Sequence, residues 1–232
     1  MNTNNNSYTL IYAVVMVVVV ALLLALVSSG LKDKQNENAA LDKKKQILSS
    51  LKVELEGQDA AALYNTLIVK ELVVDVNAQT VSEVRGEAFA VDIIKEGAKK
   101  IEERKLPIYV AQIDGKSKYI IPVRGAGLWG PIWGYIALND DKSTVYGTFF
   151  SHASETPGLG AEIALPAFQE SFVGKHILND AKEFVSIAVM KAGQKAENMD
   201  QIDAIAGGTI TSKGVEAMLL NSIGQYEAFL KQ

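Results

Sequence analysis

The longest uninterrupted hydrophobic segment lies near the N-terminus, where residues 10–27 are all apolar. As an α-helix this segment would extend about 27 Å, close to the thickness of the hydrocarbon core of a bilayer. A cleaved signal peptide is the alternative, but the segment is longer than a typical signal-peptide core, and no lysine or arginine precedes it. We therefore expect a transmembrane helix over residues 8–30, after an N-terminal tail at residues 1–7.

A charged segment follows at residues 31–60 and carries leucines at helical spacing. Steps of three, four and seven residues separate Leu41, Leu48, Leu51 and Leu55. Such steps return to one side of an α-helix. The pattern predicts a helical stalk, and a solvated linker is the alternative that the charges leave open.

Residues 61–232 mix strand and helix patterns, and we expect them to form one α+β domain. Runs rich in β-branched and aromatic residues predict strands. Turn sequences at residues 114–115 and 139–141 separate several of these runs, which indicates a partly antiparallel sheet flanked by helices. Ser212 is the expected N-cap of the last helix. The predicted strands cover residues 71–76, 88–91, 108–113, 119–123, 132–138 and 144–151, and the predicted helices cover residues 93–104, 161–173 and 215–230.

The composition narrows the chemistry that the domain can perform. The net charge of −4 provides no basic field that would attract nucleic acid. The chain has no cysteine, which excludes thiolate metal ligands and an iron–sulfur cluster of its own. It has two histidines, so a histidine-rich metal site is not expected. A redox cofactor, if the protein has one, would therefore be organic.

One segment suited to a phosphate group lies at residues 203–212. Two glycines, Gly207 and Gly208, precede Thr209, and a predicted helix follows. Glycines allow a bulky group to approach the backbone, and a helix N-terminus offers unpaired N–H groups to an anion. On spacing alone, a loop with a Ser or Thr cap explains the same residues.

Two further segments combine glycine with turn-forming or aromatic residues. Residues 152–160 contain Glu-Thr-Pro-Gly, which is typical of a tight turn. Residues 124–134 place four glycines around two tryptophans, on which a flat ring system could stack. Taken singly, these segments are explained by a turn and by core packing.

Together the three segments resemble motifs of the FMN-binding domain family: Asp-x-x-Ser/Thr-Gly-Ala-Thr, His-x-x-Glu-Thr-Pro-Gly-Leu-Gly and Gly-x-Gly-Leu-Trp. The resemblance implies that FMN is joined covalently to Thr209 through a phosphoester bond, with Thr211 and Ser212 as the other possible acceptors. Ala206 and Gly208 depart from the family pattern, which has Ser/Thr and Ala there. The further flavin-binding residues that the resemblance implies are Gly125, Trp129, Glu155, Thr156, Leu159, Asp203, Gly207 and Gly208.

With its anchor and stalk, the chain resembles the C subunits of sodium-translocating NADH:quinone oxidoreductases. The resemblance implies an electron-transfer component of a redox-driven sodium pump, with partners of B, D and E type and a flavin transferase that attaches the FMN. Electrons would pass from an iron–sulfur centre in neighbouring subunits to this FMN, and then to a second FMN in the partner of B type. The alternatives are the G subunit of an Rnf-type ferredoxin:NAD oxidoreductase, a flavin-free membrane-anchored assembly module and a flavin-sensing regulatory domain.

The charges beside the apolar segment and the family resemblance predict opposite orientations in the membrane. Lys32 and Lys34 follow the segment, so the positive-inside rule predicts a cytoplasmic domain. The resemblance implies a single-pass protein of the bacterial inner membrane with its domain on the periplasmic side. We adopt the periplasmic orientation, because the family attaches its flavin there.

Overall fold

The structure, a computed structural model, describes residues 5–232, so most of the predicted N-terminal tail lies outside it. Helix α1 (Asn6–Ser50) covers the predicted membrane segment and continues without a break through most of the predicted stalk. Its N-terminal part is long and apolar enough to cross a membrane. A helix of this composition needs no tertiary contacts in that part if lipid surrounds it, and these side chains are exposed.

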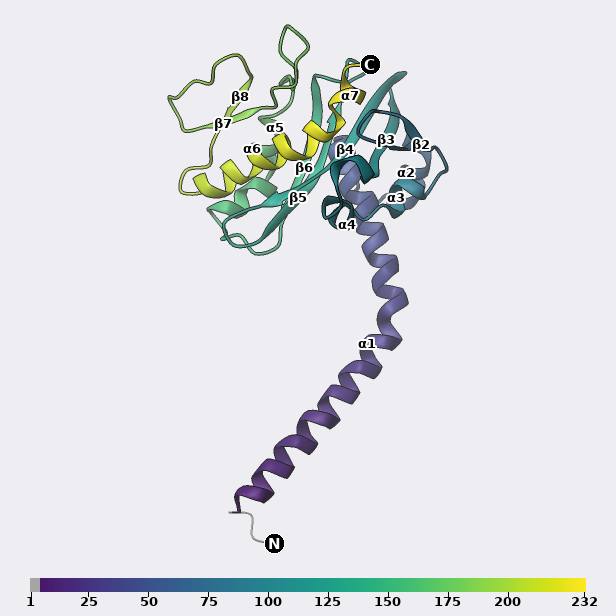
Figure 1. The fold of residues 1–232 in the computed structure, drawn as a ribbon, viewed down its shortest axis with the longest axis vertical. Helices are drawn as coiled ribbons and strands as arrows, with labels where there is room; N and C mark the ends of the chain where they lie inside the picture. The colour runs from purple at the N-terminus through teal and green to yellow at the C-terminus, as the bar shows by residue number, and fades with distance from the viewer. Residues whose placement is uncertain (1–4) are drawn as a thin grey trace. The chain divides into compact units, whose positions relative to one another are not determined.

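The domain is built on a six-stranded antiparallel sheet with the order β2-β1-β3-β4-β5-β6, as expected from the turn signals (Figure 1). A separate parallel pair, β7 (Ala188–Met190) and β8 (Gln201–Asp203), was not predicted, because three-residue strands carry little periodic signal. The strands of the large sheet are β1 (Ile68–Val74), β2 (Thr80–Ser82), β3 (Leu106–Ile113), β4 (Lys116–Ala126), β5 (Pro131–Leu138) and β6 (Val145–His152).

The main hydrophobic core lies between this sheet and α6 (Thr209–Ile223), which crosses β4 and β5 (Figure 1). Ile121 and Ile136 are paired across β4 and β5 and are fully buried. Val215 and Leu219 of α6 belong to the same buried cluster. Each fully buried aliphatic side chain contributes about 1.5 to 3 kcal/mol. This packing places the first residue of α6, Thr209, in a defined position at one end of the core.

The opposite face of the sheet carries a second group of buried side chains. Strand alternation turns Tyr109 and Tyr135 away from the main core, and their rings meet edge to face. The ring of Tyr64, in α2 (Ala60–Leu67), contacts Tyr109 in the same way. Leu48, near the end of α1, is also fully buried. The domain therefore has helices and apolar side chains on both faces of its sheet.

Residues 88–91 were predicted to be a strand, and that prediction is wrong. They fall in and just after α3 (Glu87–Ala90), a single helical turn. The buried carboxylate of Glu71 accepts the backbone N–H groups of Gly86 and Phe89, which holds the turn. Gly86 has φ of +92°, a conformation that starts the turn and that glycine adopts without a steric penalty.

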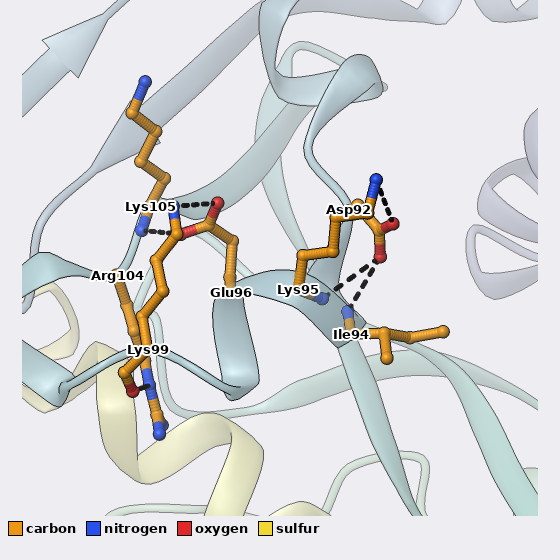
Figure 2. A network of polar contacts seen from close by, with 7 residues as sticks. All are labelled: Asp92, Ile94, Lys95, Glu96, Lys99, Arg104 and Lys105. Atoms are coloured by element: carbon orange, nitrogen blue, oxygen red, sulfur yellow. Dashed lines mark hydrogen bonds and ion pairs between the residues drawn. The ribbon is translucent and has the colours of Figure 1, made fainter.

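The predicted helix at residues 93–104 is interrupted. It consists of α4 (Ile93–Gly97) and the 3₁₀ turn η1 (Ile101–Glu103). Arg104 donates to the Lys99 carbonyl, and the Glu96 carboxylate accepts the backbone N–H of Lys105, just before β3 (Figure 2). Arg104 also donates to the Gly97 carbonyl. These contacts bend the segment back on itself, which a continuous helix would prevent.

The predicted helix at residues 161–173 is also interrupted, into η2 (Gly160–Ala164) and α5 (Pro166–Glu170). Pro166 disfavours a helical conformation in the residue before it, and Leu165 is extended, with φ of −88° and ψ of 149°. Both parts of the interrupted helix pack against β6.

The last predicted helix, at residues 215–230, begins earlier than expected and ends in two short turns. Helix α6 starts at Thr209, so Ser212 lies inside it and is not its N-cap. The Ser212 hydroxyl is fully buried and donates to the Gly208 carbonyl. Beyond Ile223 the chain continues as η3 (Gly224–Tyr226) and α7 (Glu227–Leu230).

Candidate functional site

The three glycine-containing segments meet at the N-terminus of α6 and enclose a pocket of about 280 Å³. One segment is the connection between β4 and β5, the second follows β6, and the third is the start of α6 itself. They are brought together because α6 packs against β4 and β5, which carry the first segment, and against η2, which follows the second. The pocket is lined by Leu128, Trp129, Glu155, Thr156, Leu159, Gly160, Gly207, Gly208, Thr209, Ile210 and Thr211.

The start of α6 leaves hydrogen-bond donors free on the pocket side. Gly208 is the N-cap residue and has no side chain to accept a hydrogen bond, and the first turn contains no acidic residue. Within residues 5–232, the backbone N–H groups of Thr209, Ile210 and Thr211 have no acceptor. These N–H groups and the positive end of the helix dipole make the position favourable for an anion.

Three hydroxyl groups lie in this first turn, and only one is available for chemistry. The Thr211 hydroxyl is 2% exposed and donates to the Glu155 carboxylate at 2.5 Å. Ser212 is 0% exposed, and its oxygen donates to the Gly208 carbonyl and accepts the Ile205 N–H. Thr209 is partly exposed, and its hydroxyl has no hydrogen-bond partner within residues 5–232. Thr209 is therefore the acceptor that a modifying group could reach.

The paired glycines allow the turn before α6 to lie against Leu159. Gly207 has φ of +74°, and a Cβ atom there would also lie 2.7 Å from Leu159 Cδ2. A Cβ atom on Gly208 would lie 3.0 Å from the carbonyl of Leu159. Gly207 therefore needs glycine for its backbone conformation, and a side chain at position 208 would press against the Leu159 backbone.

A buried carboxylate, that of Glu155, connects the three segments. It is 5% exposed, and its Oε1 accepts the backbone N–H of Trp129 at 2.8 Å. Its Oε2 accepts the Thr211 hydroxyl. The backbone N–H of Glu155 itself donates to Nδ1 of His152 at 3.1 Å, so the histidine holds the loop.

Large apolar side chains at the pocket are exposed to solvent. Trp129 is 66% exposed, and Leu128, Leu159 and Ile210 are each more than 40% exposed. Four such residues around one small pocket are unusual for a soluble surface without a ligand or partner. The arrangement offers flat and aliphatic surface beside a set of free N–H donors, which suits a ligand with an apolar ring and a phosphate.

Most of the predicted binding residues line this pocket, but Gly125 and Asp203 do not. Gly125 lies in β4, where a Cβ atom would be 2.7 Å from the Cβ of Met218, so it allows α6 to pack closely on the strand. Asp203 is exposed at the end of β8. The predicted residues in the lining are Trp129, Glu155, Thr156, Leu159, Gly207, Gly208 and Thr209.

Four lining residues were not among the predicted flavin contacts, although Thr211 was given as another possible acceptor. Leu128 and Gly160 belong to the same motif segments, so their position could have been inferred from their neighbours. Ile210 and Thr211 line the pocket because the helix begins at Thr209 and not at Ser212. An earlier predicted helix start would have included them.

Comparisons with known proteins agree with this site. Residues 127–224 match the model of the FMN-binding domain family, a range that contains all the lining residues. The C subunit of Na(+)-translocating NADH-quinone reductase of Pseudomonas aeruginosa is 33% identical, covering 99% of this chain and 96% of that protein. The protein of the same name from Vibrio vulnificus is 32% identical over 81% of this chain and 78% of its own length.

Solved structures show the same fold. The crystal structure of the C subunit of Na(+)-translocating NADH-quinone reductase from Parabacteroides distasonis has a TM-score of 0.80 and 46% identity, covering 87% of this chain and 98% of that one. Shewanella oneidensis NqrC has a TM-score of 0.70 at 24% identity, over 84% of this chain and 98% of that one, and supports the fold alone. With its α+β fold, its FMN-binding domain and its long apolar N-terminal helix, this chain belongs to the family of C subunits of Na(+)-translocating NADH-quinone reductase.

Proposed function

We propose that this chain is a membrane-anchored electron carrier that holds FMN covalently on Thr209 and relays electrons within a sodium-pumping NADH:quinone reductase. The observation that carries the proposal is the free, partly exposed Thr209 hydroxyl at the first position of α6, beside a pocket that two family motifs line. Thr211 and Ser212, the other possible acceptors, are buried and engaged.

The residues present fit a flavin phosphate. The three free N–H groups of the first turn would donate to phosphate oxygens, and no carboxylate in that turn opposes the negative charge. The exposed surfaces of Trp129 and Leu159 would cover apolar parts of the isoalloxazine ring. FMN bound there supplies the ability to take up and release electrons, which the protein's own side chains lack.

The covalent bond and the open pocket would serve the same purpose. A phosphoester link prevents dissociation, so the protein need not enclose the ring to retain it. The rim residues Leu128, Trp129 and Ile210 are exposed, and the ring edge would remain accessible to an electron donor and acceptor. In this scheme Thr209 is an attachment point and takes no part in turnover.

The two departures from the family motif do not conflict with the geometry at Thr209. Ala206 is exposed, so its side chain is not needed for packing. Gly208 is buried, and the alanine that the motif expects would lie 3.0 Å from both Leu159 and Ile205. Glycine at this position avoids that close contact with the Leu159 backbone.

We further propose that residues 1–7 are a tail, residues 8–30 span the bacterial inner membrane once, residues 31–60 form a stalk or linker, and residues 61–232 form the FMN-binding domain. The domain would lie on the periplasmic side, where a flavin transferase would modify it, and its partners in the complex would be of B, D and E type. The apolar part of α1 and the family membership support this arrangement.

Gel fluorescence tests the attachment. The full chain, produced together with a flavin transferase, is denatured and separated by electrophoresis, and covalent flavin is detected by its fluorescence under ultraviolet light. We expect a fluorescent band for wild type and for Thr211→Val, and none for Thr209→Ala, with circular dichroism unchanged. A fluorescent Thr209→Ala band would disprove attachment at Thr209, and a dark wild-type band would favour the flavin-free assembly module.

A further inference from the structure

We propose that Glu155 is a positioning residue that holds the pocket together and sets the potential of the flavin, and that it is not a flavin ligand. This inference rests on the proposed function. It also reverses the role that the family resemblance implies for Glu155, which is contact with the flavin.

Both oxygens of the Glu155 carboxylate are already occupied by the protein. Oε1 accepts the Trp129 N–H at 2.8 Å, and Oε2 accepts the Thr211 hydroxyl at 2.5 Å. Because the residue is only 5% exposed, little of the carboxylate remains for a ligand. The contacts join the β4–β5 connection, the segment after β6 and the first turn of α6, which are the three walls of the pocket.

Two glycines show that the space around this carboxylate is shaped for it. A Cβ atom on Gly127 would lie 2.5 Å from Oε1 of Glu155. A Cβ atom on Gly160 would lie 2.5 Å from the Thr211 oxygen and closer still to Oε2. Neither glycine has a positive φ, so space, and not backbone conformation, requires glycine at both. The same carboxylate would exclude any side chain from both positions.

The negative charge of Glu155 should also affect the reduction potential of a flavin in the pocket. Reduction of a flavin by two electrons with uptake of one proton adds one negative charge to the ring. A buried carboxylate in the wall of the same pocket opposes that charge, because the low local polarizability screens it weakly. Glu155 should therefore lower the reduction potential of the flavin, and charge near a flavin ring is a recognised means of such tuning.

The bracing role is tested on protein that carries no flavin. In the Thr209→Ala background, we would measure hydrogen exchange of the Trp129 amide by NMR for the full chain in detergent. Glu155→Ala should accelerate that exchange about tenfold, the equivalent of one ordinary hydrogen bond. Glu155→Gln should restore protection, because its amide oxygen can accept the Trp129 N–H while its NH₂ group donates to the Thr211 oxygen.

The tuning role is tested on flavin-loaded protein by spectroelectrochemical titration. Glu155→Gln keeps the hydrogen bonds and removes the charge. We expect it to raise the ratio of reduced to oxidised flavin about tenfold at a fixed potential, which is about 30 mV for a two-electron couple. Glu71→Gln, which removes a buried charge outside the pocket lining, is the matched control and should leave that ratio as in wild type.

Two results would overturn the inference: unchanged Trp129 exchange in Glu155→Ala, or an unchanged potential in Glu155→Gln. Failure of the proposed function is distinguishable from either. A wild-type chain without flavin on Thr209 would remove the electron-carrier proposal, while the exchange measurement would still report whether Glu155 braces the pocket.

Discussion

Two buried glutamates connect distant segments of this domain, one on each side of the sheet. Glu71 is 3% exposed and accepts the Tyr64 hydroxyl and the N–H groups of Gly86 and Phe89. Glu155 is 5% exposed and accepts the Trp129 N–H and the Thr211 hydroxyl. Both satisfy the rule that a buried carboxylate must be hydrogen-bonded. They differ in what surrounds them.

The surroundings of Glu71 are closed, whereas those of Glu155 face a pocket. Around Glu71 the rings of Tyr64, Phe89 and Tyr109 pack edge to face. Beside Glu155, the first turn of α6 leaves backbone donors and the Thr209 hydroxyl without a partner in the part of the chain that the structure describes. A buried, hydrogen-bonded glutamate therefore stabilises the fold at Glu71 and supports a pocket at Glu155. These unpaired donors are found beside Glu155 and not beside Glu71.

The largest effect is expected from Glu71→Ala. It would remove the carboxylate that accepts the buried Tyr64 hydroxyl and two partly buried backbone N–H groups, and we expect a loss of about 2 to 4 kcal/mol in the free energy of unfolding. Guanidinium denaturation of the detergent-solubilised chain, followed by tryptophan fluorescence, measures it. Flavin attachment to the folded fraction should be unchanged, because Glu71 is remote from the pocket lining. A selective loss of attachment without destabilisation would contradict the division of roles between the two glutamates.

The glycines beside the two glutamates should respond to alanine for different reasons. Gly160→Ala would place a methyl group against the Glu155 carboxylate, and overpacking of this kind costs about 1 to 3 kcal/mol. It should also reduce flavin attachment. Gly86→Ala has open space around its Cβ but φ of +92°, so it should cost about 1 to 2 kcal/mol through backbone strain and leave attachment intact. Denaturation and gel fluorescence of both variants separate the two causes, and equal attachment in both would refute the crowding at Glu155.

The closed core around Glu71 should make stability fall in alkali. Burial raises the pKa of Tyr64, with the nearby charge of Glu71 adding to the effect, and burial likewise raises the pKa of Tyr109 and Tyr135 on the same face and of Tyr226 in the main core. The folded state therefore keeps phenolic protons that the unfolded chain releases above about pH 10. Stability is fully present below that pH and is lost as pH rises, by about 1.4 kcal/mol per pH unit for each tyrosine. Denaturation at several alkaline pH values measures how fast the free energy of unfolding falls with pH. In Tyr64→Phe this slope should be smaller by the contribution of one tyrosine, and an identical slope in the variant would contradict the raised pKa of Tyr64.

The antiparallel part of the sheet was predictable because its signals are local. Runs such as residues 132–138 are rich in β-branched and aromatic residues, and turn residues bound them. The interrupted helices were missed because their breaks depend on Pro166 and on Arg104, which bonds to carbonyl groups of a loop. The strand predicted at 88–91 failed because Glu71, distant in sequence, holds that turn.

The sequence predicted which segments form the site, but it did not predict how their side chains are arranged. The resemblance to a family brought together residues that lie far apart in the chain, from residue 124 to residue 209, which no local pattern could do. The inward direction of Glu155 could not be read from its motif, because its partner Thr211 is 56 residues away in the chain. Gly125 shares a motif with Trp129, yet it lies within β4, where it faces Met218, whereas Trp129 lies beyond the end of that strand.

The smallest effect is expected from a matched pair of variants, each of which removes one hydroxyl donor from one glutamate. Tyr64→Phe and Thr211→Val should each lower the free energy of unfolding by about 0.5 to 1.5 kcal/mol, the usual contribution of a hydrogen bond, as measured by denaturation at neutral pH. Valine keeps the branched shape of threonine inside α6, so the second change tests the hydrogen bond and little else. Because the Thr209 hydroxyl is untouched, Thr211→Val should retain its covalent flavin. A folded Thr211→Val protein without flavin would show that attachment depends on the hydroxyl of Thr211. The support that the pocket receives would then have to be assigned to Thr211 and not to the Glu155 carboxylate alone.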